Sequence, residues 1–221
     1  MHSDPLVLIA APSVRAAFPE RFWIPDGPAL AAIEPGMLVK VRVVDLADGD
    51  ADFWDSDVVW VGVEDVGESR VHGVVVDSPL EGSGLDEGSE IAVAFDRIFD
   101  VLPVDEEGRP GLNLERVRFG LGKVAVIGLT EIRPDERVER RQFVGTLSSV
   151  EPLEGIAFEL PAGERFVLPP DGRALEEARP GTYRLRPSGE RVEDPAYACS
   201  WTVHVSELGR GASATGFQRA R

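Results

Sequence analysis

The sequence predicts a mainly β protein with minor α-helix, of the α+β class, built from two small antiparallel β domains. Short runs rich in valine and isoleucine recur along the chain, and such runs are typical of strands. Turn-forming residues separate these runs, with 23 glycines and 17 prolines among the 221 residues. The charge also differs between the two halves of the chain, which indicates two separately built parts.

In the first domain, an apolar segment at 5–12 is interpreted as a first strand or a buried segment, and a helix is predicted near residues 13–21. Ser13 is a good N-cap residue, and Pro25 stops any continuation of the helix. Four strands follow, predicted over residues 38–44, 58–63, 71–76 and 90–95. Because the links between the later strands are short and rich in turn residues, we expect an antiparallel meander that curls into a small barrel or is covered by the helix.

The strand over residues 38–44 shows the clearest alternation of side chains. Val39, Val41 and Val43 share one face of this strand, while Lys40 and Arg42 share the other. We therefore expect the strand to bury its valine face and to expose its basic face to water.

A charged segment without apolar residues, DEEGRPG at 105–111, marks the end of the first domain. The chain is thereby divided into an acidic β-rich domain over residues 1–108, a second β-rich domain over 109–208 and a flexible tail over 209–221. In the second domain, strands are predicted over residues 123–129, 143–150, 156–160, 165–168, 182–186 and 201–205. The segment LEEAR at 175–179 is predicted to form a helical turn.

The order and spacing of the strands in the first domain resemble those of a known family. The matching segments are PGMLVKV (35–41), VWV (59–61), GVVVDSP (73–79), GSEI (88–91) and IFDV (98–101). Over residues 15–102 the chain resembles a widespread uncharacterised bacterial family of small β-rich domains, some relatives of which sit near toxin-immunity proteins. Met37 and Ser89 replace the usual aspartate of two Gly-Asp turns, Asp77 stands where asparagine is common, and 45–57 is a long insertion. The resemblance implies a fold and no activity, and residues 112–221 resemble no family.

The charge distribution bears on the kind of partner. Residues 1–118 carry 24 acidic against 9 basic side chains, and residues 119–221 carry 15 against 14, which gives the whole chain a net charge of −16. Because an anionic surface repels the phosphate backbone, we expect no nucleic-acid partner. The arginine-rich stretch RPDERVERR (133–141) is interleaved with acids, and we interpret it as a nearly self-neutralised, solvated face of a helix or loop, with a polyanion site as the alternative.

Neither a membrane span nor a secretory leader is predicted. No apolar run approaches the roughly 20 residues that cross a bilayer. The apolar segment PLVLIAAP (5–12) is short and follows an aspartate rather than a basic region. With a single cysteine, Cys199, the chain has no internal disulfide framework, so we expect a cytoplasmic protein.

An acidic loop, DGDADFWDSD at 48–57, is the most suggestive local feature. Asp48, Asp50 and Asp52 match the first three ligand positions of an EF-hand, but the glycine and the final glutamate of that motif are replaced by Phe53 and Val59. We therefore predict no metal site. A different kind of cation site stays an alternative, as does a solvated loop that Phe53 or Trp54 pins to the core.

No arrangement of side chains in the sequence indicates catalysis. Cys199 and His204 lie five residues apart, so on one strand they point to opposite faces and cannot pair. The segments GSG (82–84) and GLGK (120–123) lack the frames of a nucleophile elbow and of a phosphate-binding loop. We predict no catalytic residue and no cofactor. An enzyme or small-ligand module with a site between the two domains stays the alternative.

The leading hypothesis is a non-enzymatic binding protein whose acidic first domain engages a basic protein partner; an immunity-type protein is one form of it. An aromatic ring inside an acidic loop suits a cationic surface, because cation–π attraction adds to the charge attraction. The predicted contact residues are Asp48, Asp50, Asp52, Trp54, Asp55 and Asp57. A third interpretation is that the charge serves solubility alone. The sequence predicts no oligomeric state.

Overall fold

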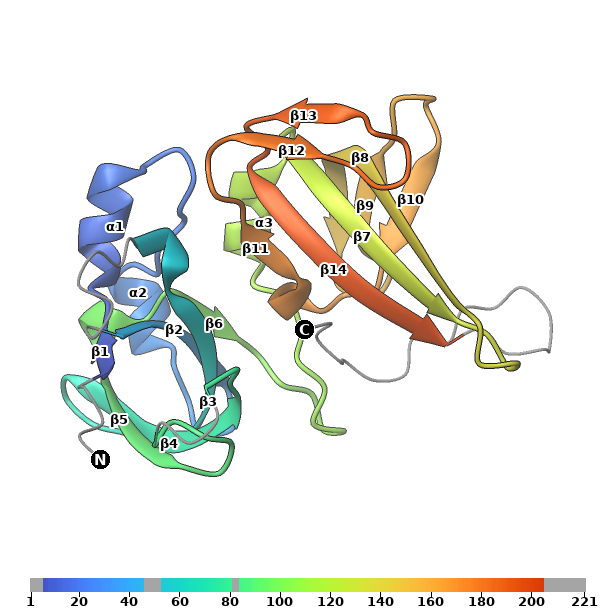
Figure 1. Ribbon diagram of the computed structural model, residues 1–221. Coiled ribbons are helices and arrows are strands. Elements are labelled where there is room, and N and C mark those ends of the chain that lie inside the picture. Colours follow the sequence, from blue (N-terminus) through green and yellow to red (C-terminus); the bar gives the residue numbers. More distant parts are fainter. Residues whose placement is uncertain (1–5, 46–52, 81–83, 205–221) are drawn as a thin grey trace. The chain divides into compact units, whose positions relative to one another are not determined.

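The computed structural model describes residues 6–45, 53–80 and 84–204, in two units (Figure 1). Contacts divide the chain into a first unit, residues 1–116, and a second unit, residues 117–221. Strands predominate in both and helices are few, which confirms the predicted mainly β, α+β class. The division falls after residue 116 rather than after the predicted 108, and the predicted tail lies outside the described residues.

The first unit is a curled antiparallel sheet. Its strands pair in the order β1-β2-β3-β4-β5, and β6 also pairs with β2. A valine-rich core lies on one face and includes Val41, Val61 and Val75. The elements are β1 (Leu6–Leu8), α1 (Ala11–Ala17), α2 (Gly27–Ala31), β2 (Leu38–Asp45), η1 (Phe53–Asp55), β3 (Asp57–Val66), β4 (Arg70–Asp77), β5 (Glu90–Ala94), η2 (Phe95–Arg97) and β6 (Asp100–Leu102).

The predicted N-terminal helix is present as α1, with different ends. It begins at Ala11 and not at Ser13, because Pro12 occupies the first turn, where a proline needs no backbone N–H. It ends at Ala17, well before Pro25. Phe18 and Phe22 follow and join an apolar cluster with Val14 of α1, so the chain leaves the helix to bury aromatic rings.

The basic face of β2 is buried, and the prediction that it meets water was wrong. Lys40 is 2% exposed and Arg42 is 5% exposed, while the valines of the opposite face are also buried. The guanidinium of Arg42 lies 5.0 Å from the ring centroid of Phe53 and 5.8 Å from that of Phe22. Aromatic residues after α1 and in η1 therefore cover the face of β2 that the alternation of valines with basic residues had predicted to be exposed to water.

The second unit contains a six-stranded sheet in the order β10-β9-β8-β7-β14-β11, together with the hairpin β12–β13. One pair in it, β7 with β14, is parallel, whereas its other pairs are antiparallel. The elements are α3 (Leu114–Gly120), which crosses the division between the units, β7 (Val124–Ile132), β8 (Val138–Glu151), β9 (Gly155–Glu159), β10 (Arg165–Leu168), η3 (Gly172–Ala174), β11 (Leu175–Glu177), β12 (Thr182–Arg184), β13 (Arg191–Glu193) and β14 (Tyr197–His204).

The segment predicted as a helical turn, LEEAR, instead supplies β11. Leu175–Glu177 pairs with Tyr197–Cys199 of β14 at the edge of the sheet. Leu175 is buried there. In a helical turn, the backbone of Leu175 could not form hydrogen bonds with β14. Pairing with β14 therefore overrode the local preference of this segment for helix.

The hairpin β12–β13 covers one end of the second sheet (Figure 1). Leu185 and Val192 pack with Val126 of β7, and Tyr183 and Val144 join the same cluster. On the other face of the sheet, Ile127 and Cys199 are buried. The longest helices among the described residues, α1 and α3, have seven residues each, and none could cross a membrane.

Candidate functional site

The structure describes half of the predicted contact site. Trp54, Asp55 and Asp57 are described, whereas Asp48, Asp50 and Asp52 lie outside the described residues. Trp54 and Asp55 belong to η1, and Asp57 begins β3. Asp55 is exposed, while Asp57 and Trp54 are half-buried.

Trp54 is anchored in an aromatic cluster. Its ring centroid lies 5.1 Å from that of Phe53, 5.3 Å from that of Phe18 and 5.5 Å from that of Phe22. Aromatic pairs at these separations and tilts contribute roughly 0.5–1.5 kcal/mol beyond their buried area. The cluster therefore holds the indole in place and leaves only a part of it for a partner.

Polar contacts fix the same segment to β2. The hydroxyl of Ser56 donates to the carbonyl oxygen of Phe53 at 2.6 Å, and Nη1 of Arg42 donates to that hydroxyl at 3.2 Å. Phe53 lies in addition under the Arg42 guanidinium. Phe53 and Trp54, the two aromatic residues expected to pin the acidic loop, thus both pack on the first unit. Asp55 and Asp57 therefore stand on a rigid segment.

The surface of the first unit is far more acidic than its composition suggests. Three of its basic side chains, Lys40, Arg42 and Arg116, are buried. Among its described residues, Arg15, Arg70 and Arg109 are the exposed basic ones. Fourteen acidic residues are exposed there: Glu20, Asp26, Glu34, Asp55, Glu64, Asp65, Glu68, Glu87, Glu90, Asp96, Asp105, Glu106, Glu107 and Glu115.

A buried ion pair joins β6 to the start of α3. Nη1 of Arg116 lies 2.8 Å from Oδ2 of Asp100, with the side chains 2% and 0% exposed. Asn113 donates to Oδ1 of Asp100 at 2.8 Å, and its own Oδ1 accepts from the backbone N–H groups of Glu115 and Arg116. Sequence reasoning missed this group, because nothing local links an aspartate on a strand to an arginine sixteen residues later.

The second unit carries a small pocket that the sequence did not indicate. It has a volume of about 160 Å³ and lies where β8, β7 and β14 run side by side. No aspartate or glutamate lines it. The lining residues are Gly128, Leu129, Thr130, Arg140, Arg141, Gln142, Ser200, Trp201 and Thr202.

The arginine-rich stretch forms the turn and strand beside this pocket. Three of its arginines are paired: Arg133 with Glu139 at 2.9 Å, Arg137 with Asp135 at 3.2 Å, and Arg141 with Glu131. The pairs match the interpretation of a largely self-neutralised stretch, although its backbone forms a turn and a strand. Arg140 makes no ion pair with any residue that the structure describes.

The described residues form no cluster of metal-ligating side chains, and the one cysteine is buried. In residues 6–45, 53–80 and 84–204, no three His, Cys, Asp or Glu residues come together to hold a metal ion. Cys199 is buried on β14, the strand that also contains His204, and it forms no disulfide. Burial makes Cys199 a packing residue, as buried cysteines ordinarily are.

The chain matches no family model, no curated protein and no solved structure. The resemblance of residues 15–102 to the uncharacterised bacterial family therefore stays a prediction.

Proposed function

We propose that this chain is a non-catalytic binding protein whose acidic first unit engages a basic protein partner. The observation that supports the proposal is the excess of acidic over basic side chains on the surface of that unit. Among the described residues of this unit, fourteen acidic side chains are exposed against three basic ones. Three further basic side chains, those of Lys40, Arg42 and Arg116, are buried in its interior. A one-sided field of this kind raises the association rate with an opposite charge by roughly 10- to 1,000-fold.

The proposed contact residues are Trp54, Asp55 and Asp57, with the loop acids Asp48, Asp50 and Asp52. The described three stand on a segment anchored by aromatic packing and by Arg42. Such preorganisation lowers the entropy cost of binding. A toxin-immunity role is one form of this function, and a single buried cysteine suits the reducing cytoplasm that we propose as its location.

The test is affinity capture from a lysate of the source cells, followed by association rates measured at stepped salt concentrations. The test variant changes Asp48, Asp50, Asp52, Asp55 and Asp57 to asparagine. We expect the native chain to retain a basic protein with a rate that falls steeply as salt rises, because screening weakens the attraction. The test variant should retain much less of it.

A matched control removes the same number of charges from the second unit. It changes Glu151, Glu154, Glu159, Glu164 and Glu193, all exposed, to glutamine. Retention by the control and loss by the test variant support the proposed contact region. Binding that is insensitive to salt contradicts the proposal, and equal behaviour of the two variants favours a solubility role for the charge. Thermal melting of each variant checks that it is folded.

A further inference from the structure

The pocket of the second unit is built by the register of three strands. Gly128 of β7 lies opposite Gln142 of β8 and Ser200 of β14, and Thr130 lies opposite Arg140 and Thr202. Because residues opposite one another share a face of the sheet, one glycine and five polar side chains gather there. Leu129, Arg141 and Trp201 alternate with them, so their side chains point to the other face.

Gly128 leaves the floor of this face open. A Cβ atom at this position would lie 3.5 Å from Oγ of Ser200, an ordinary contact distance. The glycine is therefore not required by a close backbone approach. It instead leaves room beside the serine hydroxyl, in the middle strand of the three.

The apolar cover of the sheet ends beside the opening. Two residues before Gly128 on β7, Val126 lies opposite Val144 of β8. The hairpin β12–β13 covers this apolar pair. Where the cover ends, the backbone N–H of Arg186 donates to Oε1 of Gln142 at 2.8 Å. Since the carbonyl of that amide is already used, its amino group remains as a hydrogen-bond donor.

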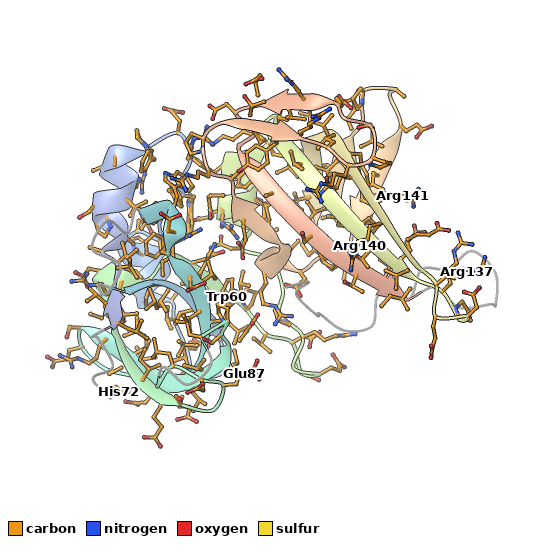
Figure 2. The ribbon with its side chains drawn as sticks, viewed as in Figure 1. Trp60, His72, Glu87, Arg137, Arg140 and Arg141 are labelled. Atoms are coloured by element: carbon orange, nitrogen blue, oxygen red, sulfur yellow. The ribbon has the colours of Figure 1, made fainter. Side chains whose placement is uncertain are left out.

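The chemistry of the lining selects a negative ligand. Around the pocket stand the guanidinium of Arg140, three hydroxyls and the Gln142 amino group, all able to donate hydrogen bonds. Arg140 is exposed and makes no ion pair with the described residues, and no carboxylate lines the pocket of a chain whose net charge is −16. Figure 2 shows Arg140 and Arg141 on β8, away from Arg137 at the turn.

The size of the pocket limits the ligand to a small group. Neighbouring strands lie about 4.8 Å apart and alternate residues of a strand about 7 Å apart, so the polar groups surround an area of about 10 Å by 7 Å. The volume of about 160 Å³ lies below the roughly 300 Å³ at which sites for drug-sized ligands begin. We propose that this pocket binds the oxyanion group of a small molecule, a phosphate or a carboxylate, with the Arg140 guanidinium as its charge partner.

The test is a nuclear magnetic resonance titration of the full, ¹⁵N-labelled chain with inorganic phosphate and, separately, with acetate. Sodium chloride is exchanged for each ligand so that ionic strength stays constant. We expect saturable shifts of the backbone amides of Gly128, Thr130 and Ser200 with at least one of the two ions. The ion that saturates at lower concentration identifies the phosphate or the carboxylate as the preferred group.

Four variants separate a built site from general charge attraction. Arg140→Gln should weaken binding at least tenfold, because it removes the charged donor. Gly128→Val, with Gly128→Ala as a milder form, should weaken it without any change of charge by filling the floor. Arg137→Gln, the matched control, removes one charge from the same stretch and should leave binding unchanged.

Two results would overturn the inference. One is the absence of saturable shifts with both ions in the native chain. The other is binding that Arg140→Gln leaves unchanged, or that Arg137→Gln weakens as much as Arg140→Gln does. The spectrum outside the pocket reports whether each variant is folded.

Discussion

At the scale of single residues, the chain buries some of its charged side chains. Asp100 and Arg116 are almost completely buried, and the carboxylate also accepts from Asn113 and from the backbone N–H of Val101. A charge removed from water is tolerated only when it is paired and hydrogen-bonded. The aspartate therefore depends on an arginine beyond the predicted end of the first domain.

Removal of Arg116 should destabilise the protein strongly. In Arg116→Met the buried carboxylate of Asp100 loses its charge partner, and we expect the free energy of unfolding to fall by about 3–5 kcal/mol. Arg137→Met is the control, since Arg137 and its partner Asp135 are both exposed and such pairs contribute about 0–1 kcal/mol. Chemical denaturation followed by circular dichroism measures both, and equal losses would contradict the prediction.

Asp105 offers a prediction on pH. Hydrogen bonds, chiefly from the backbone N–H of Arg109 and also from its guanidinium and the N–H of Glu107, lower the pKa of Asp105 from its ordinary 3.8. Since the folded-state pKa is lowered, this carboxylate stabilises the turn above the ordinary pKa, and the effect is lost as the pH falls through the lowered value.

The variant Arg109→Ala tests the cause. It keeps the backbone N–H and removes the guanidinium, so the pKa of Asp105 should rise and yet stay below its ordinary value. A carbon-detected titration of the Asp105 carboxyl measures this pKa. Full return to the ordinary value would assign the shift to the guanidinium instead.

At the scale of elements, two strands of the first sheet approach too closely for a side chain. An ideal Cβ on Gly73 of β4 would lie 2.0 Å from the carbonyl oxygen of Gly62 on β3. The register of these strands also shifts between Trp60 and Val61 and between Val63 and Asp65. Irregular pairing of this kind bends a sheet, so the glycine permits the curl.

Gly73→Ala should therefore lower the free energy of unfolding by about 3 kcal/mol, because a backbone must move to admit the methyl group. Gly27→Ala is the matched control. Gly27 is the first residue of α2, and a Cβ atom added there would have no other atom within 4 Å. It should be neutral or stabilise by up to about 1 kcal/mol. Thermal melting compares the two, and equal melting temperatures would show that β3 and β4 separate without cost.

At the scale of the whole molecule, the end of the first unit is set by α3 rather than by the charged segment at 105–111. A fragment of residues 1–121 keeps Asn113 and Arg116, and with them the partners of Asp100. A fragment of residues 1–108, cut at the boundary predicted from sequence, leaves that carboxylate buried without its arginine.

We expect the longer fragment to give a dispersed nuclear magnetic resonance spectrum and a cooperative melt, and the shorter one to melt at lower temperature or not to fold. Limited proteolysis provides a second measure, because a poorly folded fragment is cleaved faster. Equal stability of the two fragments would show that the ion pair is dispensable for the first unit.

The fold class and most of the strands follow from local patterns in the sequence. Valine alternation and turn residues predicted strands at 38–44, 71–76 and 90–95, close to the observed β2, β4 and β5. These signals are local, since the period of a strand and the conformations of glycine and proline act within a few residues. Half of the predicted contact site is described, and its function stays a prediction.

Which faces are covered and which distant residues meet depend instead on how the elements pack in the folded chain. The sequence showed Lys40 and Arg42 on one face, but both are buried, and Phe22 after α1 and Phe53 of η1 pack on Arg42. The parallel pairing of β14 with β7 brought Ser200 and Thr202 beside Gly128 and Thr130. Contacts between residues far apart in the chain leave no local pattern, and so the buried ion pair and the pocket on β7, β8 and β14 appear only in the folded protein.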